Sequence, residues 1–305
     1  MAVRENFLAF FGHIAIDVTM RVDFLPTHGT VGVNRMEENF GGTAGNFAMV
    51  AARLGAPFQL FSAVSSRTHN EYMSFLSSIG VDVSHIAIDN SEHGPIGYAV
   101  TTGKDQLYYF YQGPMNTPLT DRMENLKMDY DYVHFGTGLP LDFIRISQAN
   151  KGLRYVFDPG QEITYRYNKE NLQPLLDNSS LVMFNEAEEE MAAKILGISK
   201  SDLRARCGNL IVTRGSRGVT FYRENETLEF GTIHVENPYD TIGAGDAFRA
   251  GMYFAIHRGM DMADGIVTGS IVAAEAIKKP IKDYSMTVDR LMEIYEEQRE
   301  RLILK

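Results

Sequence analysis

The sequence Asp-Thr-Ile-Gly-Ala-Gly-Asp occupies residues 240–246 and runs directly into an apolar, helix-forming stretch that ends near residue 257. Two glycines and an alanine leave backbone N–H groups uncovered where this helix begins. Such a helix N-terminus binds phosphate readily, because free N–H groups and the helix dipole both favour an anion. Asp246 lies in the first turn, where a carboxylate beside a phosphate can accept the proton of an attacking hydroxyl. The alternative is that Asp246 only complements the helix dipole.

A second glycine-rich stretch, Gly-Gly-Thr-Ala-Gly-Asn, occupies residues 41–46 and opens a predicted helix that ends near Leu54. Paired glycines let a ligand approach the backbone closely, and the Asn46 carboxamide offers a hydroxyl both a donor and an acceptor. The alternatives are a simple glycine-rich turn and a dinucleotide-binding fingerprint. The spacing does not match the fingerprint, and no strong buried strand comes directly before it, so a dehydrogenase is disfavoured.

Short apolar runs alternate with helix-period segments through most of the chain. The runs are near-continuously apolar, as expected of strands covered on both faces. The alternation predicts a mostly parallel, doubly wound α/β sheet. We expect strands at residues 7–16, 59–64, 132–135, 155–157, 181–184 and 210–212, and helices at residues 45–54, 72–79, 244–257, 262–277 and 288–302.

Two segments, residues 19–38 and 97–111, break the alternation. The second contains an apparent hairpin, with strands at 98–102 and 107–111 joined by a turn that includes Gly103. Strands with glycine-containing turns inside an α/β chain predict a small antiparallel flap against the main body. The alternative is a pair of ordinary edge strands.

The composition limits the classes of function. The chain of 305 residues has 29 basic and 39 acidic residues and a net charge of −10, which argues against nucleic acid or an anionic membrane as a partner. Cys207 is the only cysteine, so no intrachain disulfide can form, and a reducing, cytoplasmic location is expected. The apolar run 7–11 is too short to span a bilayer and is better explained as a strand. We expect one domain over residues 1–305.

Together, the stretches 41–46 and 240–246 resemble the paired signatures of the PfkB (ribokinase-like) carbohydrate and nucleoside kinases. Four further stretches match elements of that family: residues 12–17, 80–84, 185–188 and 213–218. The resemblance covers nearly the whole chain. It implies a three-layer αβα sandwich with a mostly parallel central sheet, and a small β-sheet lid formed by residues of about 18–40 and 94–116.

The resemblance also implies roles for individual residues in ATP-dependent phosphoryl transfer. Asp246 would be the catalytic base, and the backbone of Gly243, Ala244 and Gly245 would form the anion hole. The hydroxyls of the acceptor would be held by Asp17, Gly42 and Asn46. Mg²⁺ would be bound by Asn185 and Glu188. The ATP site would be formed by Asn185, Thr213, Gly215 and Gly218. Structural alternatives are a helix cap for Asn185, a solvated helix acid for Glu188 and a turn residue for Asp17.

The acceptor is less constrained by the motifs. The stretch after Asp246 resembles archaeal-type nucleoside kinases more than fructokinases, chiefly through Arg249-Ala250-Gly251. The lid is rich in aromatic residues, which could stack on any nucleobase or simply pack across strands. Gln112 and Asn116 would contact the ribose or base. We expect a nucleoside kinase of broad base tolerance acting on the 5′-hydroxyl, with a ribokinase- or fructokinase-type sugar kinase as the alternative.

The partners expected from this interpretation are ATP and a nucleoside or sugar, and lid-to-lid pairing makes a homodimer plausible. A non-catalytic ligand sensor on the same fold would have lost the base or the anion-hole glycines, and these are all present. A metal hydrolase is disfavoured because the eight histidines are scattered and show no metal-ligand spacing.

Overall fold

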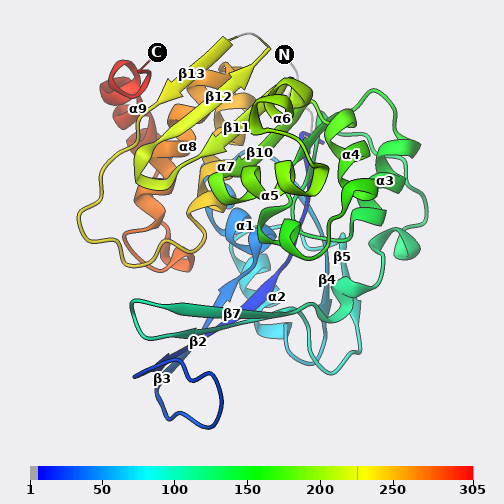
Figure 1. Ribbon diagram of the computed structural model, residues 1–305, viewed down its shortest axis with the longest axis vertical. Coiled ribbons are helices and arrows are strands. Elements are labelled where there is room, and N and C mark those ends of the chain that lie inside the picture. Colours follow the sequence, from blue (N-terminus) through cyan, green and yellow to red (C-terminus); the bar gives the residue numbers. More distant parts are fainter. Residues whose placement is uncertain (1–5, 225, 305) are drawn as a thin grey trace.

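The computed structural model describes residues 6–224 and 226–304 and has a nine-stranded sheet at its centre (Figure 1). The strand order is β13-β12-β11-β10-β9-β8-β1-β4-β5. The seven strands from β11 to β5 are parallel, and β12 and β13 continue the sheet in antiparallel pairing. The strands are β1 (Leu8–Phe11), β4 (Gln59–Ser65), β5 (Ile86–Asp89), β8 (Tyr132–Phe135), β9 (Arg154–Phe157), β10 (Leu181–Asn185), β11 (Asn209–Thr213), β12 (Val219–Arg223) and β13 (Glu226–Phe230).

The side chains of the central strands alternate between two hydrophobic cores, one on each face of the sheet. In β1, Leu8 and Phe10 belong to one core and Ala9 and Phe11 to the other. All four are buried, which is why the strand appears as an uninterrupted apolar run in the sequence.

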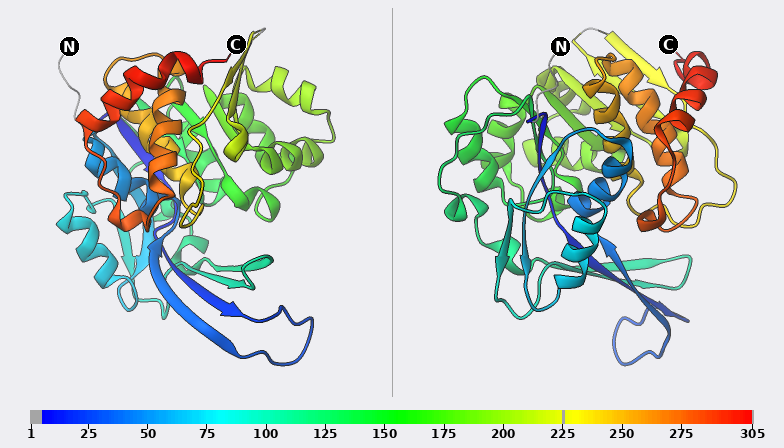
Figure 2. Two further views of the ribbon diagram at one scale, coloured as in Figure 1. Left: turned by 90° about the vertical axis from the view of Figure 1, so that its left-hand side faces the viewer. Right: turned by 180° about the vertical axis from the view of Figure 1, so that it is seen from behind.

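Helices cover both faces of the sheet (Figures 1 and 2). One core is closed by α1 (Thr43–Leu54), α2 (Asn70–Ser78), α7 (Ala244–His257), α8 (Met262–Ala276) and α9 (Val288–Leu302). The other is closed by α3 (Pro140–Ala149), α4 (Lys169–Asn178), α5 (Glu186–Leu196) and α6 (Lys200–Cys207). The result is the three-layer sandwich predicted above.

A separate four-stranded sheet projects from the body as a lid (Figure 2). Its order is β3-β2-β6-β7, with strands β2 (Ala15–Val22), β3 (Val33–Gly41), β6 (Ile96–Thr101) and β7 (Gln106–Tyr111). The β6–β7 hairpin lies where it was predicted. The first lid segment begins at Ala15 and ends at Gly41, and so extends beyond the expected residues 18–40 at both ends. The alternative of ordinary edge strands is therefore wrong, because these strands pair with one another and not with the central sheet.

One predicted strand, residues 7–16, is divided in the structure. The chain leaves the central sheet after Phe11 and enters the lid at Ala15, so only three residues join the two sheets. The break has a physical reason, because the carbonyl oxygen of His13 accepts hydrogen bonds from the N–H groups of Ala44 and Gly45 at the start of α1. No helix in the described part of the chain is long and apolar enough to cross a membrane.

Candidate active site

A cavity of about 880 Å³ lies at the carboxyl ends of the parallel strands, between the body and the lid. Its wall includes residues of both glycine-rich stretches, of lid strand β7 and of the ends of β10 and β11. Ligands bind at this edge of open parallel sheets as a rule, and the volume is typical of a small-molecule site. The predicted base, acceptor-binding and nucleotide-binding residues Asp246, Gly243, Gly245, Asp17, Gly42, Asn46, Asn185, Glu188 and Thr213 all line it.

The turn predicted to bind an anion lies at the start of α7. Gly243 is the N-cap residue and has a φ of 79°, a backbone conformation that favours glycine. The N–H of Ala244 donates to the Thr241 carbonyl at 3.2 Å. The N–H groups of Gly243, Gly245 and Asp246 have no hydrogen-bond partner among residues 6–224 and 226–304, so they remain available to an anion. Of the three residues predicted to form the anion hole, Gly243 and Gly245 line the cavity, whereas Ala244 does not line it and its N–H is already bonded.

The Asp246 carboxylate is buried and held on both sides. Its Oδ2 accepts from Asn46 Nδ2 at 3.0 Å, and its Oδ1 accepts from Arg249 Nη1 at 2.9 Å. Burial raises the pKa of Asp246 from 3.8 to about 7, although Arg249 and Asn46 favour the ionised form. A carboxyl with a pKa near neutrality is well suited to accept a proton and release it again.

Asp17 lies on lid strand β2 and faces the same cavity. Its Oδ1 accepts from the Tyr108 hydroxyl at 2.9 Å across the lid, and burial raises the pKa of Asp17 to about 6. Beside it, Gly42 caps α1 with a φ of 81°, and a Cβ there would lie 2.5 Å from the His13 carbonyl oxygen. The second glycine stretch therefore allows strand and helix backbones to meet next to the Asp17 carboxylate.

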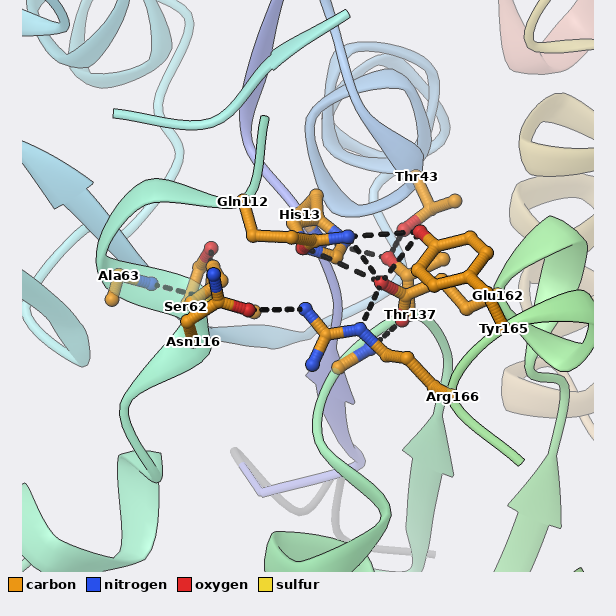
Figure 3. Close-up of polar contacts among 12 residues, drawn as sticks. His13, Thr43, Ser62, Ala63, Gln112, Asn116, Thr137, Glu162, Tyr165 and Arg166 are labelled. Atoms are coloured by element: carbon orange, nitrogen blue, oxygen red, sulfur yellow. Dashed lines mark hydrogen bonds and ion pairs between the residues drawn. The ribbon is translucent and has the colours of Figure 1, made fainter. Parts of the chain in front are cut away.

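A buried hydrogen-bond network joins the end of the lid to the body beside the cavity (Figure 3). Gln112, just after β7, accepts from His13 Nε2 at 2.5 Å and donates to Glu162 Oε1 and the Tyr165 hydroxyl, both at 2.8 Å. Glu162 also accepts from the Gly138 N–H and pairs with Arg166. Burial lowers the pKa of His13, so the imidazole is neutral near pH 7.

Neither Gln112 nor Asn116 lines the cavity, in contrast to the prediction that they contact the ribose or base. The atoms of the Gln112 carboxamide are taken up by His13, Glu162 and Tyr165. Asn116 is exposed and accepts from Arg166 Nη2 at 3.1 Å, on the outer side of the network (Figure 3). The cavity wall near them is formed instead by His13, Glu162 and Tyr165.

The residues predicted to bind the nucleotide lie at the ends of β10 and β11, where Asn185 and Thr213 are register partners on neighbouring strands and line the cavity. Asn185 caps α5, as its structural alternative predicts. Its Oδ1 accepts from the Glu188 N–H at 2.9 Å, and the Glu188 carboxylate accepts from the Asn185 N–H and Nδ2, both at 2.8 Å. Gly215 and Gly218 lie in the adjoining loop and do not line the cavity. A Cβ at Gly218 would lie 2.0 Å from the Phe230 carbonyl oxygen, so this glycine meets a packing requirement.

Mg²⁺ suits the donor set at this end. Glu188 and Asn185 supply carboxylate and amide oxygens facing the cavity, and burial raises the pKa of Glu188 to about 7. No cluster of three or more His, Cys, Asp or Glu side chains suited to a metal occurs within the described ranges. Such a cluster is not required, because Mg²⁺ commonly binds through one or two carboxylates, water and substrate phosphates.

Several residues of the site were not predicted from the sequence as site residues. Asp158 is an acid directly after a predicted strand, which is a usable signal for a site at the carboxyl edge of the sheet. Glu162, Tyr165 and Thr137 carried no such signal, because they belong to irregular segments that only the fold brings to the cavity.

Comparison with known families agrees with the geometry. The sequence model of the family described as "pfkB family carbohydrate kinase" matches residues 5–287. The chain belongs to the PfkB family. It is therefore a kinase that transfers a phosphoryl group to an alcohol, and kinases of this family use ATP.

Individual PfkB relatives are archaeal nucleoside kinases. The chain is 36% identical to a nucleoside kinase of Thermoplasma acidophilum over 94% of each protein. It is 28% identical to one of Methanocaldococcus jannaschii, covering 92% of this chain and 95% of the relative. The crystal structure of the Methanocaldococcus jannaschii nucleoside kinase superposes with a TM-score of 0.85, at 25% identity, over 96% of this chain and 98% of that one.

Proposed function

We propose that this PfkB kinase transfers the γ-phosphate of ATP to the 5′-hydroxyl of ribonucleosides, with broad tolerance of the base. The observation that carries the proposal is one continuous cavity that holds three parts. These are Asp246 with the α7 N-terminus, the ends of β10 and β11, and the aromatic side chains of β7, all of which line the same cavity. The nucleoside kinase relatives support the choice of acceptor.

In this mechanism Asp246 takes the proton from the acceptor hydroxyl, and the oxygen then attacks the γ-phosphorus. The bond from that phosphorus to the β–γ bridging oxygen breaks, and ADP leaves. The free N–H groups of Gly243 and Gly245 stabilise the charge on the transferring group, since preformed donors in a site of low polarity are strongly stabilising. Mg²⁺, held by Glu188 and Asn185, would neutralise charge on the phosphates.

Asp17 and Asn46 would hold hydroxyls of the sugar, and the aromatic side chains of β7 would hold the base. Phe110 lies with its ring at 22° to that of Tyr108 and meets the His13 ring edge-on at 4.9 Å between centroids. Stacking on such rings does not depend on which base is present. The alternative acceptor is a free sugar, because Asp17 and Asn46 would bind its hydroxyls equally well.

An ADP-release assay with ATP and Mg²⁺ tests the proposal on ribonucleosides, ribose, fructose and fructose 6-phosphate. We expect turnover with several nucleosides and none with free sugars. Turnover only with a sugar or sugar phosphate would establish the alternative. No turnover with any acceptor, despite binding of ATP, would revive the non-catalytic sensor.

The role of the aromatic wall has its own test. Phe110→Ala should raise the KM for nucleosides about 5- to 150-fold, which corresponds to about 1–3 kcal/mol of stacking, and leave the KM for ATP unchanged. Tyr111→Ala is the matched control, because the neighbouring ring is 49% exposed and does not line the cavity. Equal effects of both substitutions on the nucleoside KM would mean that the lid aromatics act only in packing.

A homodimer through the lid and a cytoplasmic location also remain proposals. The lid exposes Leu107, Tyr109 and Tyr111 on alternate positions of β7, with Met36 on β3. An apolar strip of this kind is typical of a surface that another chain covers. Light scattering after gel filtration should give about twice the 34.2 kDa chain mass. Replacing Tyr109 with a charged residue should reduce the measured mass to that of a single chain.

A further inference from the structure

Arg249 lies one helical turn after Asp246 on α7 and bonds to two buried carboxylates at once. Its Nη1 donates to Asp246 Oδ1 at 2.9 Å, while Nη2 donates to Asp158 Oδ1 at 2.6 Å and Nε pairs with Asp158 Oδ2. The Asp158 and Asp246 side chains are only 1% and 8% exposed. Asp158 follows β9, so this pair joins the central sheet to the helix that carries the proposed base.

Arg249 is the only lysine or arginine among the described residues that line the cavity. The groups around Asp246 on other elements are neutral or acidic: Asn46 on α1, Asp17 on β2 and Glu188 on α5. His134 on β8 lies 3.6 Å from Asp158, but burial holds its pKa well below the ordinary value, so it adds no charge near pH 7.

This charge arrangement has a chemical consequence for the base. Removing two carboxylates from water disfavours their ionised forms, and each carboxylate further disfavours the other. A cation in direct contact with both opposes this effect. Without Arg249, Asp246 would remain protonated up to a higher pH than in its presence, and a protonated carboxyl cannot accept the proton of the acceptor hydroxyl.

We propose that Arg249, held in place by Asp158, is a positioning residue that keeps the Asp246 carboxylate ionised and oriented toward the acceptor hydroxyl. The inference rests on the proposed function, in which Asp246 is the base. Arg249 acts through Asp246 and not by contact with the transferred phosphoryl group.

The pH dependence of kcat/KM tests the inference, because the rate should fall at low pH as Asp246 is protonated. An opposite charge in contact lowers the pKa of a carboxyl by about 1–3. Arg249→Gln should therefore move the acid limb up by about 1–3 pH units, whereas Arg249→Lys should move it less. Asp158→Asn should move the limb in the opposite direction, to lower pH, because it removes a negative neighbour and leaves the cation. A purely structural role would lower the rate without these opposed shifts.

Arg249→Gln leaves the Asp158 carboxylate buried without a charged partner, which destabilises the fold for that reason alone. The comparison of Asp158→Asn with the double variant Asp158→Asn/Arg249→Gln avoids this problem, since both buried charges are then removed together. The acid limb should lie at higher pH in the double variant than in the single one. Arg290→Gln, at an exposed arginine of α9, is the matched control and should leave the profile unchanged. Coincident profiles for the single and double variants would overturn the inference.

A second comparison separates action through Asp246 from direct contact with phosphate. On an Asp246→Asn background, Arg249→Gln should change kcat less than threefold, because the group through which it acts is already absent. A further loss of tenfold or more on that background would overturn the inference and assign Arg249 to the phosphoryl group. If Asp246→Asn itself retained the wild-type rate, the proposed function would lose its base, which is a separate and recognisable failure.

Discussion

Replacing the proposed base with asparagine tests both the chemistry and the energetics of the site. Asp246→Asn keeps the size of the side chain but removes the ability to accept a proton. A general base contributes about 10²–10⁴-fold to the rate. At about 1.4 kcal/mol for each factor of ten, this is a loss of about 3–5 kcal/mol of transition-state stabilisation.

The same substitution should make the protein more stable at high pH. Because burial raises the pKa of Asp246 from 3.8 to about 7, the ionised carboxylate costs roughly 4 kcal/mol of folding free energy above pH 7. The cost declines as the pH falls through 7 and is absent only below 3.8, where the unfolded chain also binds the proton. Asparagine loses part of the hydrogen bonding to Asn46 and Arg249, at roughly 1 kcal/mol for each bond, so the net gain at pH 8 should be about 1–3 kcal/mol.

The assay combines turnover at saturating ATP with chemical unfolding at pH 8 and pH 4. We expect a rate loss of about 10²–10⁴-fold and a stability gain that is larger at pH 8 than at pH 4. Asp289→Asn, at an exposed acid in the first turn of α9, is the control for the loss of one carboxylate. Wild-type turnover in Asp246→Asn would refute the assignment of the base. Equal destabilisation at both pH values would refute the electrostatic reasoning.

Three further predictions concern the surrounding residues. Asp17→Ala should raise the KM of the acceptor about 10- to 100-fold and leave the KM for ATP unchanged, because the loss corresponds to one hydrogen bond to a charged group. An equal loss of ATP affinity would mean that Asp17 has only a structural role. Glu188→Gln should raise the Mg²⁺ concentration for half-maximal rate about tenfold at pH 8, and an unchanged Mg²⁺ titration would leave Glu188 with only its capping role. Gly42→Ala should destabilise the protein in urea by about 2 kcal/mol more than Gly55→Ala. Both glycines have positive φ, but only at Gly42 would the Cβ collide with backbone, so equal effects would contradict this packing argument.

The parts of the fold that the sequence predicted well are those with a strong local signal. Strands β8, β10 and β11 are covered on both faces and have continuous apolar runs, and α7 and α9 have clear helical periods. The two glycine stretches were also recognisable, because a backbone with positive φ favours glycine in the sequence. Gly42 and Gly243 both have positive φ beside the start of a helix.

Other features depend on contacts that sequence spacing does not reveal. Helices α3, α4, α5 and α6 were not predicted, although the cap of α5 at Asn185 was considered as the alternative to Mg²⁺ and ATP binding. The prediction for Gln112 was wrong in its contact, because the partners His13 and Glu162 are 99 and 50 residues away in the chain. Hydrogen bonding over such separations follows from the tertiary fold alone.

The short connection between β1 and β2 matters for any attempt to engineer this enzyme. Asp17 belongs to β2, where it is the register partner of Asn39 and Gly97, and β2 follows the central strand after three residues. A lid transplanted from another kinase would therefore replace Asp17, which we propose binds the acceptor, together with the aromatic side chains of β7. The lid is therefore not an interchangeable module. Changing the substrate preference requires the substitution of single side chains within it.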